Sequence, residues 1–271
     1  MARLGSWIEP FPEGIYVRPA DAWIDPSESK ARALVTHGHA DHARGGHGTV
    51  WATPETLAIM ECRYGPQNGS PVQYGEAMKL GEVDISFVPA GHVLGSAQIV
   101  MDYSGERVVV SGDYKRRSDP TCAPFEPVPC DIFITEATFG LPVFRHPETA
   151  SEIDRLLLRL HENPERCVLV GAYGLGKAQR VIMELRCRGH DDPIYIHGAL
   201  QRLCELYVEY GVALGDLRPP TGASKEELRG RIILCPPGAL NDRWSRRLPD
   251  PRTWPAGTKL TSSSPIRMPS P

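Results

Sequence analysis

At 271 residues, with 41% hydrophobic residues, 23% charged residues and a formal net charge of −3, the chain has the composition of an ordinary globular protein. These values exclude wholesale disorder and the strongly basic character of many nonspecific nucleic-acid-binding proteins, and no apolar run reaches transmembrane length. Seven scattered cysteines without a CxxC pair, and an N-terminus without a signal peptide, lead us to expect a reduced cytoplasmic protein with no membrane partner.

The first half of the chain is predicted to be rich in strands. Short apolar runs alternate with turn residues between 14 and 60, and a helix is expected from about Pro54, because proline is favoured in the first turn of a helix. Further apolar runs predict four strands, at about 84–89, 97–102, 107–111 and 131–135.

The second half of the chain has a different pattern, and we place a domain boundary near 138–148. A helix is predicted over 149–162, with Thr149 and Glu152 as its capping box. Strands and helices then alternate, which is typical of βαβ units and a parallel sheet. Their expected bounds are strand 166–172, helix 176–188, strand 193–197, helix 199–211 and strand 231–234. Residues 249–271 are rich in proline and serine and are predicted to form a disordered tail.

Metal-ligating side chains are concentrated after a strand that ends at Thr36. His37, His39, Asp41 and His42 place three imidazoles and a carboxylate within six residues, and these groups suit zinc and related divalent ions. One ion cannot easily take all four side chains from so short a segment. The spacing therefore predicts two ions, one held by the first two histidines and one by Asp41 and His42.

Two further ligands are predicted by the same reasoning. His92 follows the strand at 84–89, and Asp113 follows the strand at 107–111. Each lies in a loop at a strand end, where a rigid sheet can position ligands. Taken alone, His92 is ambiguous and Asp113 is an ordinary turn residue; beside the first cluster both are predicted to bind metal.

Several segments resemble the signatures of one superfamily. HGHADH at 37–42 resembles the HxHxDH motif of the metallo-β-lactamase superfamily, and the GH at 91–92 and GD at 112–113 resemble its next two motifs. TEATFG at 135–140 resembles the acidic motif that opens the β-CASP domain of its nucleic-acid-cleaving members, and GAYGLGKAQR at 171–180 resembles a glycine-rich turn within that domain. From about residue 5 to about 250 the chain is similar to the bacterial ligase-associated DNA damage response exonucleases, relatives of Artemis and the mRNA 3′-end processing endonuclease.

The resemblance implies an α/β fold in which a metallo-β-lactamase αββα sandwich at 1–138 is followed by an inserted β-CASP-like α/β domain at 139–248. It implies two divalent ions, zinc or manganese. The implied first-metal ligands are His37, His39 and His92, the implied second-metal ligands are Asp41 and His42, and Asp113 is the implied bridge. Asp25 is implied to orient a metal ligand and Glu136 a site histidine, with Asp41 and Glu136 as the catalytic carboxylates.

The function implied by the resemblance is metal-dependent hydrolysis of DNA phosphodiester bonds, by an exonuclease acting in repair on single-stranded DNA beside a ligase and a helicase. Four residues are weaker candidates for substrate contacts, namely Lys115, Gly174, Gly176 and Lys177. Glycines before a helix start favour phosphate binding, although a tight turn between strand and helix explains them equally well.

Three other functions stay open at this point. An RNA 3′-end processing nuclease would use the same site, since reading a 2′-hydroxyl depends on contacts that the motifs do not identify. A small-molecule metallohydrolase is disfavoured by TEATFG and the second domain. The resemblance also leads us to expect two later histidine motifs, but no histidine follows His197. We therefore expect a truncated C-terminus, and an inactive remnant is the third alternative.

Overall fold

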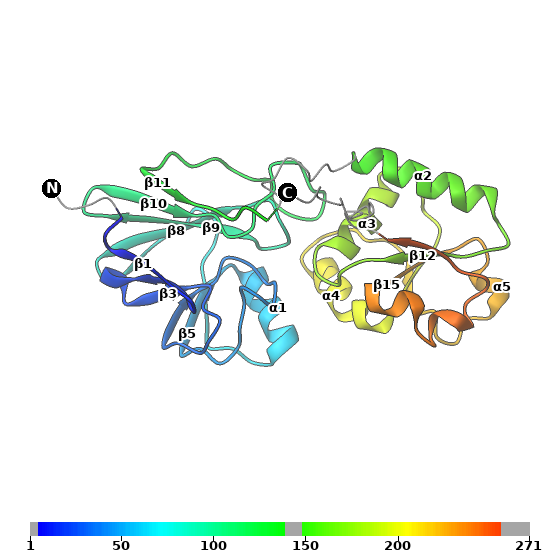
Figure 1. Ribbon diagram of the computed structural model, residues 1–271, viewed down its shortest axis with the longest axis horizontal. Coiled ribbons are helices and arrows are strands. Elements are labelled where there is room, and N and C mark those ends of the chain that lie inside the picture. The colour runs from blue at the N-terminus through cyan, green and yellow to red at the C-terminus, as the bar shows by residue number, and fades with distance from the viewer. Residues whose placement is uncertain (1–4, 139–147, 256–271) are drawn as a thin grey trace, which may run out of the picture. The chain divides into compact units, whose positions relative to one another are not determined.

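Figure 1 shows the computed structural model, which describes residues 5–138 and 148–255. The chain divides into two compact units: Met1–Ala137 with Arg202–Ala213, and Thr138–Gln201 with Leu214–Pro271. The segment 202–213, expected in the second domain, thus groups with the first unit. Its fully buried Tyr207 accepts a hydrogen bond from the Leu94 backbone N–H at 3.3 Å.

The first unit contains two β-sheets. The first sheet has the order β1-β2-β3-β4-β5-β6, antiparallel as far as β3 and parallel beyond it. Its strands are β1 (Ile8–Phe11), β2 (Gly14–Val17), β3 (Ala22–Ile24), β4 (Arg32–Leu34), β5 (Thr49–Ala52) and β6 (Gly69–Pro71). The second sheet has the order β11-β10-β9-β8-β7. Its strands are β7 (Ala77–Leu80), β8 (Val83–Pro89), β9 (Ala97–Tyr103), β10 (Glu106–Val110) and β11 (Ile132–Ile134).

Alternating side chains from both sheets form the main core of this unit. On β8 the inward residues Val83, Ile85 and Phe87 are buried, while the residues between them are more exposed, as expected for a strand with one face on a core. They pack with Ile24 and Leu34 of the first sheet. This layer of apolar side chains keeps the loops at the sheet edges in fixed positions.

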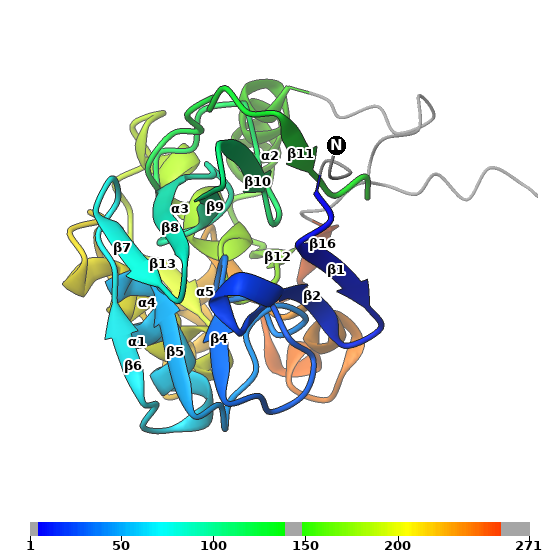
Figure 2. The ribbon, with the colours of Figure 1, turned by 90° about the vertical axis from the view of Figure 1, so that its left-hand side faces the viewer.

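Helix α1 (Pro54–Tyr64) covers the outer face of the first sheet, where β4, β5 and β6 run side by side (Figure 2). Its buried Leu57 and Met60 form a second apolar cluster with Ala33 and Val50 of the sheet. The helix begins as predicted, because Pro54 occupies its first turn and the Thr53 side chain accepts a hydrogen bond from the backbone N–H of Thr56.

The second unit contains a parallel sheet of order β14-β13-β15-β12-β16. Its strands are β12 (Val168–Gly171), β13 (Ile194–Ile196), β14 (Leu217–Arg218), β15 (Ile232–Cys235) and β16 (Arg252–Pro255). The helices of this unit are α2 (Thr149–Glu162), α3 (Lys177–Arg186) and α5 (Lys225–Leu228), while α4 (Gly198–Glu209) belongs to this unit only up to Gln201. The 3-10 turns are Pro237–Asn241 and Ser245–Arg247 in this unit and Arg18–Ala20 in the first. Strands β12, β13 and β15 are buried along their whole length, which explains why their sequences are continuous apolar runs.

The mixed α/β architecture and its predicted strands and helices are confirmed, with two local corrections. The capping box on α2 is wrong, because Glu148 is the residue before the helix and no side chain caps it. The predicted tail from 249 is also corrected, since Arg252–Pro255 form β16 beside β12. Few apolar residues lie between the prolines of this segment, so its sequence does not show the pattern of a strand. Residues 256–271 lie outside the described part of the chain.

Among the described residues, none of the helices has the length and apolar content needed to cross a bilayer.

The seven cysteines are all free thiols, and their burial predicts which of them react. Cys167 and Cys235 are buried on the sheet of the second unit, and burial raises the pKa of each thiol to about 12. Cys187 is exposed. We expect Ellman's reagent at neutral pH to modify Cys187 fastest in the folded protein and to leave Cys167 and Cys235 unmodified, because the thiolate is the reactive form. Cys187→Ser should remove the fastest phase; equally rapid labelling of Cys167 would contradict the packing of this sheet.

Candidate metal centre

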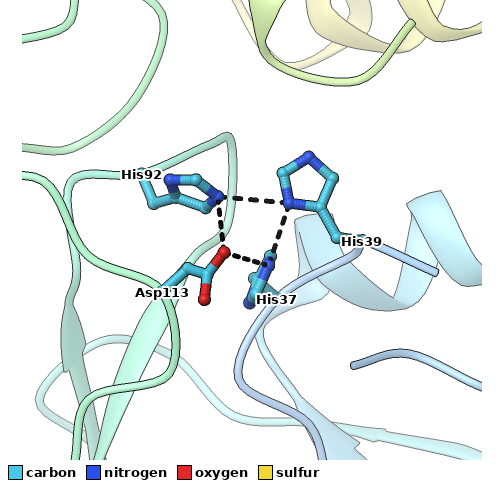
Figure 3. A group of neighbouring side chains, drawn as sticks. All are labelled: His37, His39, His92 and Asp113. Atoms are coloured by element: carbon cyan, nitrogen blue, oxygen red, sulfur yellow. Dashed lines mark hydrogen bonds and ion pairs between the residues drawn. The ribbon is translucent and has the colours of Figure 1, made fainter. Parts of the chain in front are cut away.

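Loops from both sheets of the first unit bring four predicted ligands together (Figure 3). His37 and His39 follow β4, His92 follows β8, and Asp113 follows β10. One ligand atom from each lies within 4.8 Å of the others. The sheets are joined at this edge by a backbone hydrogen bond of 2.8 Å from Ala97 N–H to the Thr36 carbonyl oxygen.

The separations between these atoms suit one metal ion. Nε2 of His37 and Nε2 of His92 lie 3.0 and 3.1 Å from Nδ1 of His39. Oδ2 of Asp113 lies 3.9 Å from Nε2 of His37 and 3.4 Å from Nε2 of His92. Ligand atoms on a tetrahedral zinc ion, each about 2.0–2.1 Å from the metal, lie about 3.4 Å apart. The donor set and its spacing therefore fit a divalent ion.

The second oxygen of Asp113 faces another predicted ligand. Oδ1 lies 3.5 Å from Nε2 of His42, and the same ring nitrogen lies 3.9 Å from Oδ2 of Asp41. The Asp41 side chain is 79% exposed. Asp113 thus presents one oxygen to the three-histidine group and the other to His42, which is the arrangement that a carboxylate needs in order to bridge two ions.

Asp25 and Thr36 fix the orientation of the His37 and His42 rings through hydrogen bonds. Asp25 accepts hydrogen bonds from the Thr36 backbone N–H at 2.8 Å and from the Thr36 hydroxyl at 2.6 Å, and its Oδ2 lies 2.8 Å from Nδ1 of His42. The Thr36 hydroxyl oxygen also lies 3.1 Å from Nδ1 of His37. Since the hydroxyl donates to Asp25, it accepts from His37, and this leaves Nε2 of His37 free to bind metal.

Sequence reasoning missed three residues that fix the loops. Besides Thr36, Arg63 on α1 donates a hydrogen bond of 2.8 Å to the carbonyl oxygen of Gly38, between the first two histidines. The Ser96 hydroxyl oxygen accepts from the backbone N–H of His92 at 3.0 Å. No local motif marks these residues, because each acts across a turn or between elements.

At two positions in these loops a neighbouring group lies so close to the backbone that only glycine fits. A Cβ on Gly112, which has φ +53°, would lie 2.6 Å from the Thr36 hydroxyl. A Cβ on Gly91, which has φ +72°, would lie 2.4 Å from the carbonyl oxygen of Lys115. These are the glycines of the GH and GD motifs, so the motifs combine a ligand with the space that its loop needs.

Burial and charge divide the histidines into two kinds. His37 is fully buried, and burial lowers its pKa well below the ordinary value, while burial lowers the pKa of His92 to about 4. Both rings are therefore neutral at neutral pH and keep a lone pair for a metal. Burial alone would lower the pKa of His42, but hydrogen bonds to Asp113 and Asp25 raise it to about 10, so this ring would have to lose a proton in order to bind a metal. The same hydrogen bond from His42 lowers the pKa of Asp113.

The remaining predicted site residues lie outside the four-ligand group. Glu136 is half-buried and follows β11, the strand beside β10. Lys115 is ion-paired with Asp119, so its positive charge is neutralised. In the second unit, Gly176 with φ +81° precedes α3, and Lys177 is the first residue of that helix. Gly174 accepts a hydrogen bond of 2.9 Å from Gln179, as expected for a tight turn between a strand and a helix.

Comparison with known proteins gives three informative relatives, although no family model matches the sequence. A probable DNA ligase of Opitutus terrae is 28% identical over 253 residues, covering 91% of this chain and 24% of the ligase. A ribonuclease of Thermus thermophilus is 30% identical over 217 residues, covering 68% of this chain and 50% of the ribonuclease. Cleavage and polyadenylation specificity factor subunit 3 of Dictyostelium discoideum is 29% identical over 144 residues, 49% of this chain and 18% of that protein.

The chain is a homologue of the metallo-β-lactamase/β-CASP nucleases. It spans 24% and 50% of the lengths of the first two relatives. This homology agrees with the geometry, because the three histidines and Asp113 of the family-like motifs are the four side chains that meet in the first unit.

The hydrogen bonds of the Thr36 hydroxyl to His37 and Asp25 predict that its removal lowers the affinity for metal. Thr36→Val keeps the size of a side chain that is only 1% exposed but removes the hydroxyl that contacts His37 and Asp25. We expect the affinity for zinc, measured by competition with a chromophoric chelator, to fall roughly 10- to 100-fold.

Thr121→Val is the matched control. Thr121 is also buried, and its hydroxyl donates to Asp119 at 2.6 Å, which is not one of the four candidate ligands. This variant should lose some thermal stability and keep its metal affinity. Equal metal affinities in the two variants would contradict a positioning role for Thr36.

Proposed function

We propose that the chain carries the metal-binding part of a nuclease that hydrolyses phosphodiester bonds in DNA. The observation that carries this proposal is the placement of Asp113 between two groups of ligands, with Oδ2 toward His37 and His92 and Oδ1 toward His42. A small-molecule hydrolase would not need the second unit.

In this proposal His37, His39 and His92 would hold one divalent ion, Asp41 and His42 would hold a second, and Asp113 would contribute to both. Such a pair of ions supplies activation of water at neutral pH and neutralisation of charge on the phosphate. The side chains of this chain fix the ligand positions through Thr36 and Asp25 and keep the first imidazoles neutral by burial. Imidazole and carboxylate donors suit both zinc and manganese, so either ion fits the site.

Glu136 is proposed to orient a histidine of the site. Its place directly after β11 supports this role, since β10 and β11 are parallel and Asp113 follows β10. The carboxyl ends of the two strands lie at one sheet edge. A carboxylate that fixes a ligating ring acts through that ring and touches no substrate.

DNA is the proposed substrate, with exonucleolytic cleavage during repair. The match to a probable DNA ligase over 91% of this chain supports it, because that relative is named as an enzyme that acts on DNA. Cooperation with a DNA ligase, and with a helicase, in the cytoplasm is part of the same proposal. RNA is the second candidate substrate, since another relative is a ribonuclease.

Cleavage assays with Asp113 variants test the proposal. We expect the chain to digest 5′-phosphorylated single-stranded DNA when zinc or manganese is added, and EDTA to stop the digestion. Asp113→Asn should lower the rate at least about 100-fold, because a neutral amide replaces the carboxylate that faces both ligand groups.

Asp131→Asn is the control, because this exposed carboxylate lies on the same loop and accepts from the backbone N–H of Arg107. It should keep full activity. A matching RNA assayed in parallel separates the two candidate substrates. Metal-loaded protein that cleaves neither DNA nor RNA would refute the proposal.

A further inference from the structure

An aromatic and basic surface lies on the segment that runs from Asp113 to the end of β11. It consists of Tyr114, Arg116, Arg117, Phe125 and Phe133, and we call it the aromatic–arginine surface. None of these residues contributes to the four-ligand group. All of them belong to the first unit.

The three rings form a connected cluster. The Tyr114 ring lies 5.2 Å from the Phe125 ring at 39° and 6.1 Å from the Phe133 ring at 80°. Phe133 is 41% exposed, because its neighbours Ile132 and Ile134 pack on the core and Phe133 points to the other face of the strand. Such an exposed ring on an edge strand offers a π face to a ligand.

The two arginines add positive charge to this surface. Arg116 and Arg117 are both exposed, and within residues 5–138 and 148–255 no ion pair joins either guanidinium to a carboxylate. Arg107 on β10 differs, since it is paired with Asp102 at 2.8 Å. The acidic group of the same loop, Asp119, is already paired with Lys115.

This surface begins at the candidate metal centre. Tyr114 directly follows Asp113. Val109 of β10 pairs with Phe133 of β11, and the Ser111 backbone N–H donates to the Ile134 carbonyl oxygen at 2.9 Å. The exposed ring and the metal ligand therefore belong to neighbouring strands of one sheet edge.

We propose that the aromatic–arginine surface binds single-stranded nucleic acid, with unpaired bases stacking on Phe133 and Tyr114 and phosphates contacting Arg116 and Arg117. Aromatic rings interleaved with unpaired arginines are the groups that single strands require, because stacking needs a base whose face is free and the backbone needs positive charge. In a duplex the base faces are already stacked. The inference rests on the proposed nuclease function and names residues outside the candidate metal centre that would bind its substrate.

Binding to the metal-free protein tests the surface without cleavage. Fluorescence anisotropy with a labelled short oligothymidylate in EDTA gives the affinity at several salt concentrations. We expect the double substitution Arg116→Ala and Arg117→Ala to weaken binding roughly tenfold at low salt. It should also reduce the slope of log affinity against log salt by about 1.4, because each phosphate of a single strand that an arginine neutralises adds about 0.7 to that slope.

Arg246→Ala with Arg247→Ala is the matched control. These adjacent arginines are exposed on the 3-10 turn Ser245–Arg247 of the second unit, so the control removes the same charge elsewhere. It should change the affinity less than twofold. Equal decreases in affinity from the two double variants would overturn the inference, since they would reflect net charge alone.

Phe133→Leu tests stacking while keeping an apolar side chain on the strand. We expect roughly tenfold weaker binding of oligothymidylate, unchanged binding of an abasic oligonucleotide of equal length, and recovery in Phe133→Tyr. Full affinity of Phe133→Leu for oligothymidylate, or equally tight binding of a hairpin duplex by the original chain, would overturn the inference. The same measurement with oligouridylate distinguishes DNA from RNA as the ligand. If Phe133→Leu weakens the binding of both polymers, the surface binds single strands of either sugar. If it weakens the binding of only one, that polymer is the ligand of the surface.

The two proposals fail in distinguishable ways. Cleavage with metal, combined with unchanged binding by these variants, overturns the surface and leaves the nuclease function standing. Surface-dependent binding without any metal-dependent cleavage supports the surface and refutes the nuclease function.

Discussion

Thr36 joins the two sheets of the first unit to the candidate metal centre. Its carbonyl oxygen accepts from Ala97 of the second sheet, its N–H and hydroxyl both donate to Asp25, and its hydroxyl oxygen contacts Nδ1 of His37. Gly112, which precedes Asp113, lies too close to this side chain for any Cβ. Buried hydrogen bonds of this kind are costly to leave unmade, so they fix the register between the loops that carry the ligands. The positions of His37, His42 and Asp113 all depend on this one residue.

The ligand geometry has a thermodynamic consequence. Ring nitrogens 3.0 and 3.1 Å apart and a carboxylate oxygen 3.4 Å away bring lone pairs together in a half-buried site, and His37 is fully buried. A divalent ion would relieve this crowding, and its binding to the folded chain would add to the free energy of folding. The aromatic–arginine surface starts one residue beyond Asp113, so the proposed substrate contacts and the proposed metal bridge share a loop.

Local sequence indicates which candidate ligands meet, but it does not identify the residues that hold them in place. The cluster is encoded in short motifs at strand ends, so His37, His39, His92 and Asp113 can be identified before the fold is known. Thr36, Arg63 and Ser96 cannot, because their roles come from contacts made between elements. The same limit applies to β16, whose few apolar residues form a strand only because β12 offers an edge. The grouping of 202–213 with the first unit likewise reflects the burial of Tyr207, which no local pattern signals.

X-ray absorption spectroscopy at the zinc edge, on the chain loaded with one equivalent of zinc, tests the central claim most directly. The account predicts a shell of nitrogen and oxygen ligands at about 2.0–2.1 Å with the scattering signature of three imidazoles, reduced by one ring in His92→Ala. A sulfur shell at about 2.3 Å would contradict it, because the zinc would then be bound by cysteines outside the candidate centre. An imidazole signal unchanged in His92→Ala would contradict it equally, since His92 would then not be a ligand.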